Sequence, residues 1–98
     1  MINYENKHVI VRGDRSGVFF GVMESIKGRE VTLKNARKLY FWAGACAVEQ
    51  LAVDGVANPS ECKFTVFVDD ILILDAIQIL PCSEKSCHSL TGVIPWSK

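Results

Sequence analysis

The sequence lacks the features that would place the protein in a membrane or in the secretory pathway. Its apolar runs are short: Ile71–Leu74, for example, is extended past Asp75 only by Ala76 and Ile77, far too short to span a bilayer. The first residues, Met1–Lys7, contain no apolar h-region, so no signal peptide is expected. Eleven basic and 11 acidic residues give a net charge of zero, and hence no bulk attraction to nucleic acid or anionic lipid. We therefore expect a cytoplasmic protein.

Motifs of the common enzyme classes are absent as well. There is no G-x-S-x-G, no Walker loop and no H-E-x-x-H, and His8 has no nucleophile at a motif spacing. Cys82, Cys87 and His88 form the only metal-like cluster, with Cys62 at an irregular spacing as the fourth ligand that zinc requires. No Cys-x-x-Cys pair occurs, and we expect reduced, free thiols. We thus expect no metal, no cofactor and no enzymatic activity.

What the chain does have is a large apolar fraction for its size. It contains 98 residues, of which 49% are hydrophobic. This length predicts one domain over residues 1–98. A domain so small cannot bury all of its apolar surface alone, and homo-oligomers cover patches that a monomer exposes. We therefore expect a homo-oligomer, at least a dimer.

The first half of the chain predicts three strands and a helix. His8–Arg12 is rich in β-branched residues, and Gly17–Ile26 is a longer run whose glycines indicate a bent or bulged strand. A hairpin turn at Lys27–Arg29 leads to Glu30–Leu33, where apolar and polar residues alternate. Ala43–Val53 is rich in alanine, with apolar residues at helical spacing, and predicts a short amphipathic helix.

The second half predicts two or three strands and a terminal helix. Lys63–Val68 alternates as a strand does, and Asp69–Asp70 is expected to end it. Ile71–Leu80 gives either one bent strand or two short ones. Ser83 is a suitable N-cap for one or two helical turns over Glu84–Leu90.

Together these segments predict an α+β fold. We expect a small, strongly curved antiparallel sheet or an SH3-like barrel of about five strands, with an inserted short helix and a short C-terminal helix. The apolar tail Val93–Trp96 is expected to pack back on the body.

Aromatic and cationic side chains are concentrated just before the predicted first helix. Arg37 offers a planar set of donors suited to phosphate or carboxylate. Tyr40 and Trp42 offer faces on which a base or a cation can stack, and Asn35 can read a base edge or a ribose hydroxyl. The alternative is that the aromatic residues are core at a strand-to-helix corner and Arg37 is solvated. Following an alternating strand, Arg37 is expected to project from the rim of the sheet.

Two further features would suit an anion. Ala43–Ala45 opens the predicted helix with small residues, which would let an anion approach its backbone N–H groups. The first turn carries Arg12 and Arg15, which would join a phosphate site if this turn lay near Arg37. The alternative is an exposed turn of mixed charge.

Residues 17–36, GVFFGVMESIKGREVTLKNA, resemble the first motif of Sm-like proteins. The shared features are a bent second strand, a glycine hairpin and an alternating third strand. The Sm pattern has no helix inserted after the third strand, so the resemblance does not carry RNA binding over. The net charge of zero also argues against nucleic acid, because phosphate contacts dominate such affinity.

A longer series of motifs covers nearly the whole chain. VxLxNARxLxxWxGA at Val31–Ala45 is followed by QLAVDGV at Gln50–Val56, CKFTV from Cys62 and IQILPCSEK from Ile77. In this order they resemble a family of short proteins of unknown function in tailed phages and prophages. The resemblance implies a viral or prophage origin and expression in a bacterial cytoplasm. It supplies no reaction, ligand or catalytic residue.

Three functions follow as hypotheses. A non-enzymatic phage accessory protein would sequester a nucleotide-derived immune signal of the host in a pocket of a homo-oligomer. Alternatively, the protein inhibits a host defence protein, or serves as a structural accessory, through an apolar surface or an exposed sheet edge. The third hypothesis is an Sm-like nucleic-acid binder. The candidate ligand-binding residues are Asn35, Arg37, Tyr40, Trp42, Arg12 and Arg15.

Overall fold

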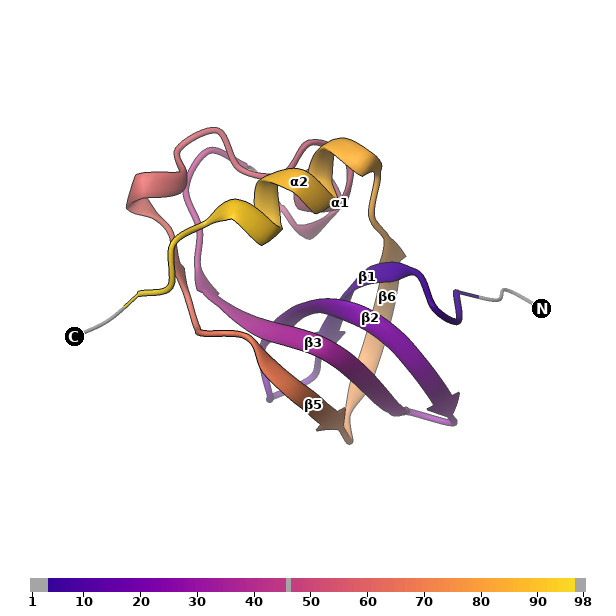
Figure 1. The fold of residues 1–98 in the computed structure, drawn as a ribbon. Helices are drawn as coiled ribbons and strands as arrows, with labels where there is room; N and C mark the ends of the chain where they lie inside the picture. Colours follow the sequence, from indigo (N-terminus) through magenta and orange to yellow (C-terminus); the bar gives the residue numbers. More distant parts are fainter. Residues whose placement is uncertain (1–3, 46, 97–98) are drawn as a thin grey trace.

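The computed structural model describes residues 4–45 and 47–96 (Figure 1). Three strands are followed by a short helix, three more strands and a second helix. The sequence predicts this order, with two or three strands between the helices. The elements are β1 (His8–Gly13), β2 (Val18–Lys27), β3 (Glu30–Phe41), α1 (Val48–Asp54), a 3₁₀ turn (Pro59–Glu61), β4 (Lys63–Phe64), β5 (Val68–Ile73), β6 (Ala76–Pro81) and α2 (Glu84–Gly92).

All six strands belong to one antiparallel, strongly curved sheet. Its order is β4-β3-β2-β1-β6, and β5 also pairs with β3. β5 and β6 follow each other through a turn at Leu74–Asp75, yet β5 pairs with β3, which β2 and β1 separate from β6 in the strand order. The sheet must therefore curl until its two ends meet, while both helices lie together on one side of it (Figure 1). The predicted α+β class with a curved antiparallel sheet is confirmed.

Apolar residues cover both faces of the sheet. In β1, Val9 and Val11 point to one face and Ile10 to the other, as strand alternation requires. The inner cluster fills the inside of the curve: Val9, Val11, Phe19, Met23, Val31, Leu33, Ala36, Ile73 and Ala76. The helix-side cluster packs the other face against the helices: Ile10, Phe20, Leu39, Val48, Leu51, Ala52, Val56, Cys62, Phe64, Leu90 and Val93.

A bulge at Asn35 changes the face that the second half of β3 presents. Asn35 has a φ of 47°, and the register between β2 and β3 shifts in this region. Leu33 and Ala36 therefore both lie in the inner cluster, although an uninterrupted strand would put them on opposite faces. Beyond the bulge, Arg37 and Leu39 face the helix side. A displacement by one residue moves every following side chain to the other face.

Two predicted boundaries before residue 60 are wrong. β3 does not end at Leu33 but continues to Phe41, because it pairs with β2 on one edge and with β4 and β5 on the other. α1 begins at Val48 rather than Ala43, since Gly44 has a φ of 86°, outside the helical region. The small residues Ala43–Ala45 thus precede the helix and do not offer its N–H groups to an anion.

The strand boundaries after residue 60 also differ from the prediction. The expected strand Lys63–Val68 is divided between β4 and the first residue of β5. Asp69–Asp70 does not break the chain but lies within β5, where Asp70 is the partner of Lys34. Of the two alternatives for Ile71–Leu80, two short strands is the correct one. Pairing with β3 outweighs the low strand propensity of aspartate here.

The predicted C-terminal helix and its N-cap are confirmed in α2. Ser83 is its N-cap, and the Ser83 hydroxyl accepts a hydrogen bond from the Ser86 amide at 3.0 Å. The buried Ser86 hydroxyl donates to the Leu51 carbonyl at 2.6 Å and so ties α2 to α1. After α2, Val93 is buried, whereas Ile94 is 83% exposed. The tail therefore packs back only in part.

Candidate binding surfaces

Arg37 does not project from the rim of the sheet; its side chain is fully buried, with 0% exposure. It lies opposite Phe20 in the β2–β3 ladder, on the face covered by the helices. The guanidinium carbon is 5.3 Å from the ring centre of Phe64 and 4.5 Å from that of Phe67. The expected exposed position is wrong because the bulge at Asn35 turns Arg37 toward the helices.

The Arg37 guanidinium joins two distant segments through their backbone carbonyls. Its Nε donates to Thr65 O at 2.9 Å, and its Nη1 donates to Leu90 O at 3.0 Å and Val93 O at 2.8 Å. Leu90 lies in the last turn of α2 and Val93 just after it, so the cation meets the negative end of the helix dipole.

Burial has two consequences for Arg37. Desolvation lowers the pKa of its guanidinium, yet an arginine side chain keeps its proton in proteins. The Nη2 atom is buried without a hydrogen-bond partner among the described residues. The charge is balanced by carbonyl dipoles and aromatic faces inside the fold, and the donors that a phosphate would need are enclosed.

The structure does not gather the other predicted cationic residues around Arg37. Arg12 and Arg15 are exposed, as is Asn35 at the bulge, whereas Arg37 is enclosed. One phosphate cannot contact an enclosed guanidinium and two exposed ones together. The six predicted residues therefore do not form a single pocket in this chain.

The turn that carries Arg15 already holds an anionic group of the protein itself. The Asp75 carboxylate accepts hydrogen bonds from the Arg15 amide at 2.7 Å, the Ser16 amide at 3.1 Å and the Ser16 hydroxyl at 2.6 Å. The Asp14 amide also donates to the Asp75 carbonyl, at 2.9 Å. These bonds fasten the β1–β2 turn to the β5–β6 turn, and they occupy the amides that an external anion would use.

We expect replacement of Asp75 by alanine to lower the melting temperature and to remove part of its dependence on acid. The hydrogen bond from the Ser16 hydroxyl, followed by that from the Arg15 amide, lowers the pKa of Asp75 in the folded protein. The stabilisation that the Asp75 carboxylate provides is therefore present at pH values above its unfolded-state pKa of about 3.9. It is lost as the pH falls through the lower folded-state pKa. Thermal melts of the wild type and Asp75→Ala between neutral pH and pH 2 measure this.

Asp69→Ala is the matched control, because it removes an exposed carboxylate from β5, the strand that leads into the turn of Asp75. An Asp75→Ala protein that melts like the wild type at neutral pH would contradict the fastening role of Asp75.

The two predicted stacking residues lie in different surroundings. Trp42 is half-buried and packs against the helix-side cluster, so for this residue the core interpretation is correct. Tyr40 is 62% exposed. The β3–β4 register shifts between Leu39 and Phe41, so Tyr40 is the extra residue of a second bulge.

Tyr40 belongs to an exposed cluster that we call the aromatic patch: Tyr40, Phe41, Lys63 and Trp96. Tyr40 and Trp96 are stacked with 5.8 Å between ring centres and 5° between ring planes. The Lys63 ammonium lies 5.2 Å from the Trp96 ring centre and 6.0 Å from that of Phe41. The Trp96 amide donates to Phe64 O at 2.8 Å, which holds the tail on this surface. The patch therefore brings β3, β4 and the C-terminal tail together.

Only Tyr40 of the aromatic patch was predicted as a site residue. Phe41 was missed because the bulge that turns it outward leaves no periodic signal. Lys63 and Trp96 are separated from Tyr40 along the chain, and only the β3–β4 pairing and the Trp96–Phe64 hydrogen bond bring them to it.

The thiols that the structure describes are free. Burial raises the pKa of Cys82 to about 11 and also raises that of Cys87, so both stay protonated at neutral pH. Cys62 is a buried free thiol, and Cys46 lies outside the described residues. Within residues 4–45 and 47–96, no three His, Cys, Asp or Glu side chains lie close enough to hold a metal ion.

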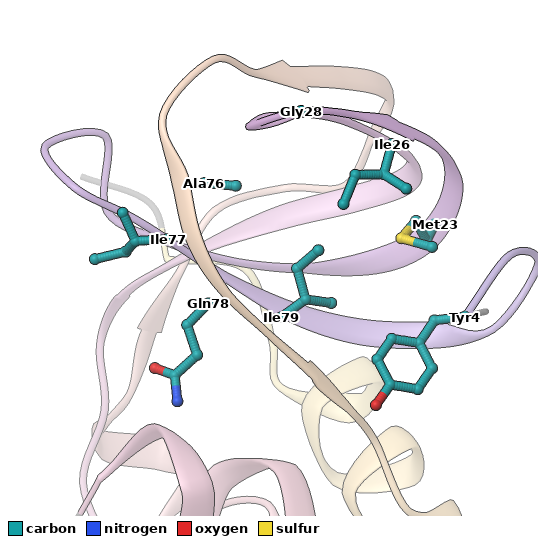
Figure 2. Close-up of a pocket in the computed structure, with 8 residues that line it drawn as sticks. All are labelled: Tyr4, Met23, Ile26, Gly28, Ala76, Ile77, Gln78 and Ile79. Carbon is teal, nitrogen blue, oxygen red and sulfur yellow. The ribbon is translucent and has the colours of Figure 1, made fainter. Parts of the chain in front are cut away.

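A second surface feature is a cavity of about 320 Å³ between the second half of β2 and β6; we call it the seam groove. Figure 2 shows Met23 and Ile26 from β2 and Ile79 from β6 pointing into it, with Tyr4 at one end. Its lining carries no charged side chain: Tyr4, Met23, Ile26, Gly28, Ala76, Ile77, Gln78 and Ile79. It extends the inner cluster, against which Tyr4 and Ile79 pack, to the surface.

The described residues thus define a small α+β protein with an aromatic patch, an uncharged groove and a buried arginine cross-link. The chain belongs to the family described as a domain of unknown function (DUF6948), whose model matches residues 6–90. The predicted membership of a family of unknown function is confirmed, whereas the phage origin and the Sm-like relation stay predictions. No curated protein and no solved structure matches the chain. No helix in the described ranges is long and apolar enough to cross a membrane.

Proposed function

We propose that this protein is a non-enzymatic binding protein that contacts a partner protein through the aromatic patch. The observation that carries the proposal is the exposure of three aromatic rings together, with Tyr40 62%, Phe41 50% and Trp96 43% exposed. Exposed apolar clusters mark interaction sites, and tyrosine, tryptophan and phenylalanine are enriched in the buried centres of protein interfaces.

The arrangement of the rings favours a protein over a nucleotide. One face of Tyr40 is covered by Trp96, and the Lys63 ammonium lies over Trp96 and Phe41. The rings therefore present a preassembled surface with no open slot between them for a base. A preordered surface loses little side-chain entropy when it binds, which is how aromatic anchors contribute to affinity.

The resemblance to phage and prophage proteins extends the proposal. On that resemblance, the partner is a protein of the bacterial host, such as a component of a defence system, and binding takes place in the host cytoplasm. The protein would then act by occupying the partner, without catalysis.

The double variant Tyr40→Ser/Trp96→Ser tests the proposal. It should fold with nearly the wild-type melting temperature, because Tyr40 and Trp96 lie at the surface and neither belongs to a core cluster. Loss of interface anchors should weaken partner binding by about thirtyfold or more, the equivalent of about 2 kcal/mol. The measurement is affinity capture from host lysate with tagged wild type, followed by titration of the captured partner against each variant.

Ile94→Ser is the matched control, since Ile94 is 83% exposed on the same tail but is not part of the aromatic patch. The proposal fails if the double variant and the control retain the partner equally well.

Sequestration of a nucleotide-derived signal is the second candidate. The stacked pair Tyr40–Trp96, with the Lys63 ammonium 5.2 Å from the Trp96 ring centre, is a stacking platform next to a cation, which supports this candidate. A thermal-shift series with cyclic and ADP-ribose-derived nucleotides separates the two proposals, because a ligand of the native state must raise the melting temperature. Stabilisation that disappears in the double variant would favour the nucleotide.

A further inference from the structure

One wall of the seam groove is the second half of β2, whose outer edge has no backbone partner beyond Met23 within residues 4–45 and 47–96. β1 pairs with β2 only as far as His8 opposite Val22. The segment before β1 extends this pairing by two backbone hydrogen bonds: Asn6 N donates to Met23 O, and Met23 N donates to Lys7 O. Asn6 then adopts a φ of 64° and turns the chain away. From Glu24 to Lys27, β2 pairs only with β3 among the described residues.

The opposite wall is β6, the last strand of the sheet. One edge of β6 pairs with β1. Beyond that ladder, its contact with the β2–β3 hairpin is made by Ala76 and Arg29: Ala76 N donates to Arg29 O at 3.0 Å, and Arg29 Nε donates to Ala76 O at 3.4 Å. Between this closed end and Tyr4 the groove is open (Figure 2).

The lining of the seam groove disfavours a charged ligand. Its side chains are aliphatic or uncharged, and Gln78 already donates to Glu49 on α1 at 3.1 Å. Away from the Arg29 guanidinium at its closed end, a charged group placed in the groove would lose its hydration without gaining an opposite charge. The volume of about 320 Å³ is at the lower end of the range of about 300–1,000 Å³ for ligand sites, enough for a few side chains.

We propose that the seam groove binds an extended, uncharged segment of another protein, which adds as a strand to the free edge of β2 at Glu24–Lys27. Main-chain hydrogen bonds to β2 would provide affinity, and pockets for alternate side chains would provide specificity. Because neighbouring side chains of a strand point to opposite faces, every second residue would enter between Met23, Ile26 and Ile79. This site is separate from the aromatic patch and does not depend on it.

The test uses a peptide probe and residue-resolved NMR of the whole chain. The probe is an acetylated, amidated peptide of alternating isoleucine and threonine with a lysine at each end for solubility. We expect millimolar probe to shift the amide signals of Glu24–Lys27 and the methyl signals of Met23 and Ile79, and to slow hydrogen exchange at the β2 amides. The same peptide with alternate backbone amides N-methylated should bind about tenfold more weakly or worse, since it lacks half of its donors.

Ile26→Lys is the matching protein variant, because Ile26 lines the groove yet is 50% exposed, so the fold should tolerate the change. Ile94→Lys places the same charge at an exposed isoleucine elsewhere. Ile26→Lys should abolish the shifts and Ile94→Lys should leave them unchanged. The proposal is overturned if the groove signals do not move, if both peptides bind equally, or if the probe-free protein is a dimer by light scattering whose groove is already protected.

Discussion

Replacement of Arg37 by alanine is expected to destabilise the protein severely, although arginine is usually a surface residue. The change removes a fully buried side chain and leaves the carbonyls of Thr65, Leu90 and Val93 without their donors. Cavity formation and unpaired buried carbonyls together should cost about 3–5 kcal/mol. Small domains have a total free energy of unfolding of about 5–15 kcal/mol, so Arg37→Ala removes a large part of it.

Two further variants show which property of Arg37 matters. Arg37→Met keeps most of the volume and removes a charge that has no carboxylate partner, so it should be less destabilising than Arg37→Ala. Trp42→Ala should cost less than Arg37→Ala, because Trp42 is only half-buried. Urea unfolding of the three variants measures the differences. An Arg37→Ala protein within about 0.5 kcal/mol of the wild type, the usual range for surface positions, would show that Arg37 is exposed in solution.

Gly44→Ala should have the second-largest effect. Gly44 has a φ of 86°, which costs a residue with a Cβ about 1–2 kcal/mol. A Cβ there would also lie 2.7 Å from the Ala57 nitrogen and 2.8 Å from the Asn58 nitrogen, both backbone atoms that a rotamer change cannot move. With about 1–3 kcal/mol for this overpacking, the total is on the order of 3 kcal/mol.

Two other glycine positions separate the cost of the positive φ from the cost of the close contact with the backbone. Gly28 has a φ of 62° with nothing within 4 Å of its Cβ position, so Gly28→Ala should show the conformational cost alone. Gly92 has neither a positive φ nor a close neighbour, and Gly92→Ala should be close to neutral. Urea unfolding should therefore rank Gly92→Ala, Gly28→Ala and Gly44→Ala in order of increasing cost. Equal losses for Gly28→Ala and Gly44→Ala would contradict the close approach to Ala57.

Much of the fold could be predicted because its signals are local. The β-branched run of β1, the glycine hairpin between β2 and β3 and the Ser83 cap of α2 each depend on residues close in sequence. The limits of β3 and β5 could not be predicted, since they depend on pairing between distant strands. Aspartates would end an isolated strand, but the pairing of Asp70 with Lys34 keeps them within β5.

The candidate site was harder to predict because it depends on two bulges. Alternation counted from Val31 does not reveal the extra residue at Asn35. Without it, Arg37 would share the face of Val31 and Leu33 in the inner cluster; with it, Arg37 lies against α2. The second bulge makes Tyr40 the extra residue and leaves Phe41 exposed beside it, and Trp96 reaches Tyr40 from the far end of the chain. Bulges with no glycine or proline at the extra residue leave little trace in a single sequence.

The contacts of Arg37 also have a consequence for the evolution of this chain. Its three hydrogen-bond acceptors are main-chain carbonyls, at Thr65, Leu90 and Val93, which every amino acid supplies. Substitutions at those three positions leave the acceptors in place, whereas almost any substitution at position 37 removes the donors. Selection should therefore hold position 37 fixed while its partners drift, and a search for paired substitutions among relatives would find no position that changes together with it.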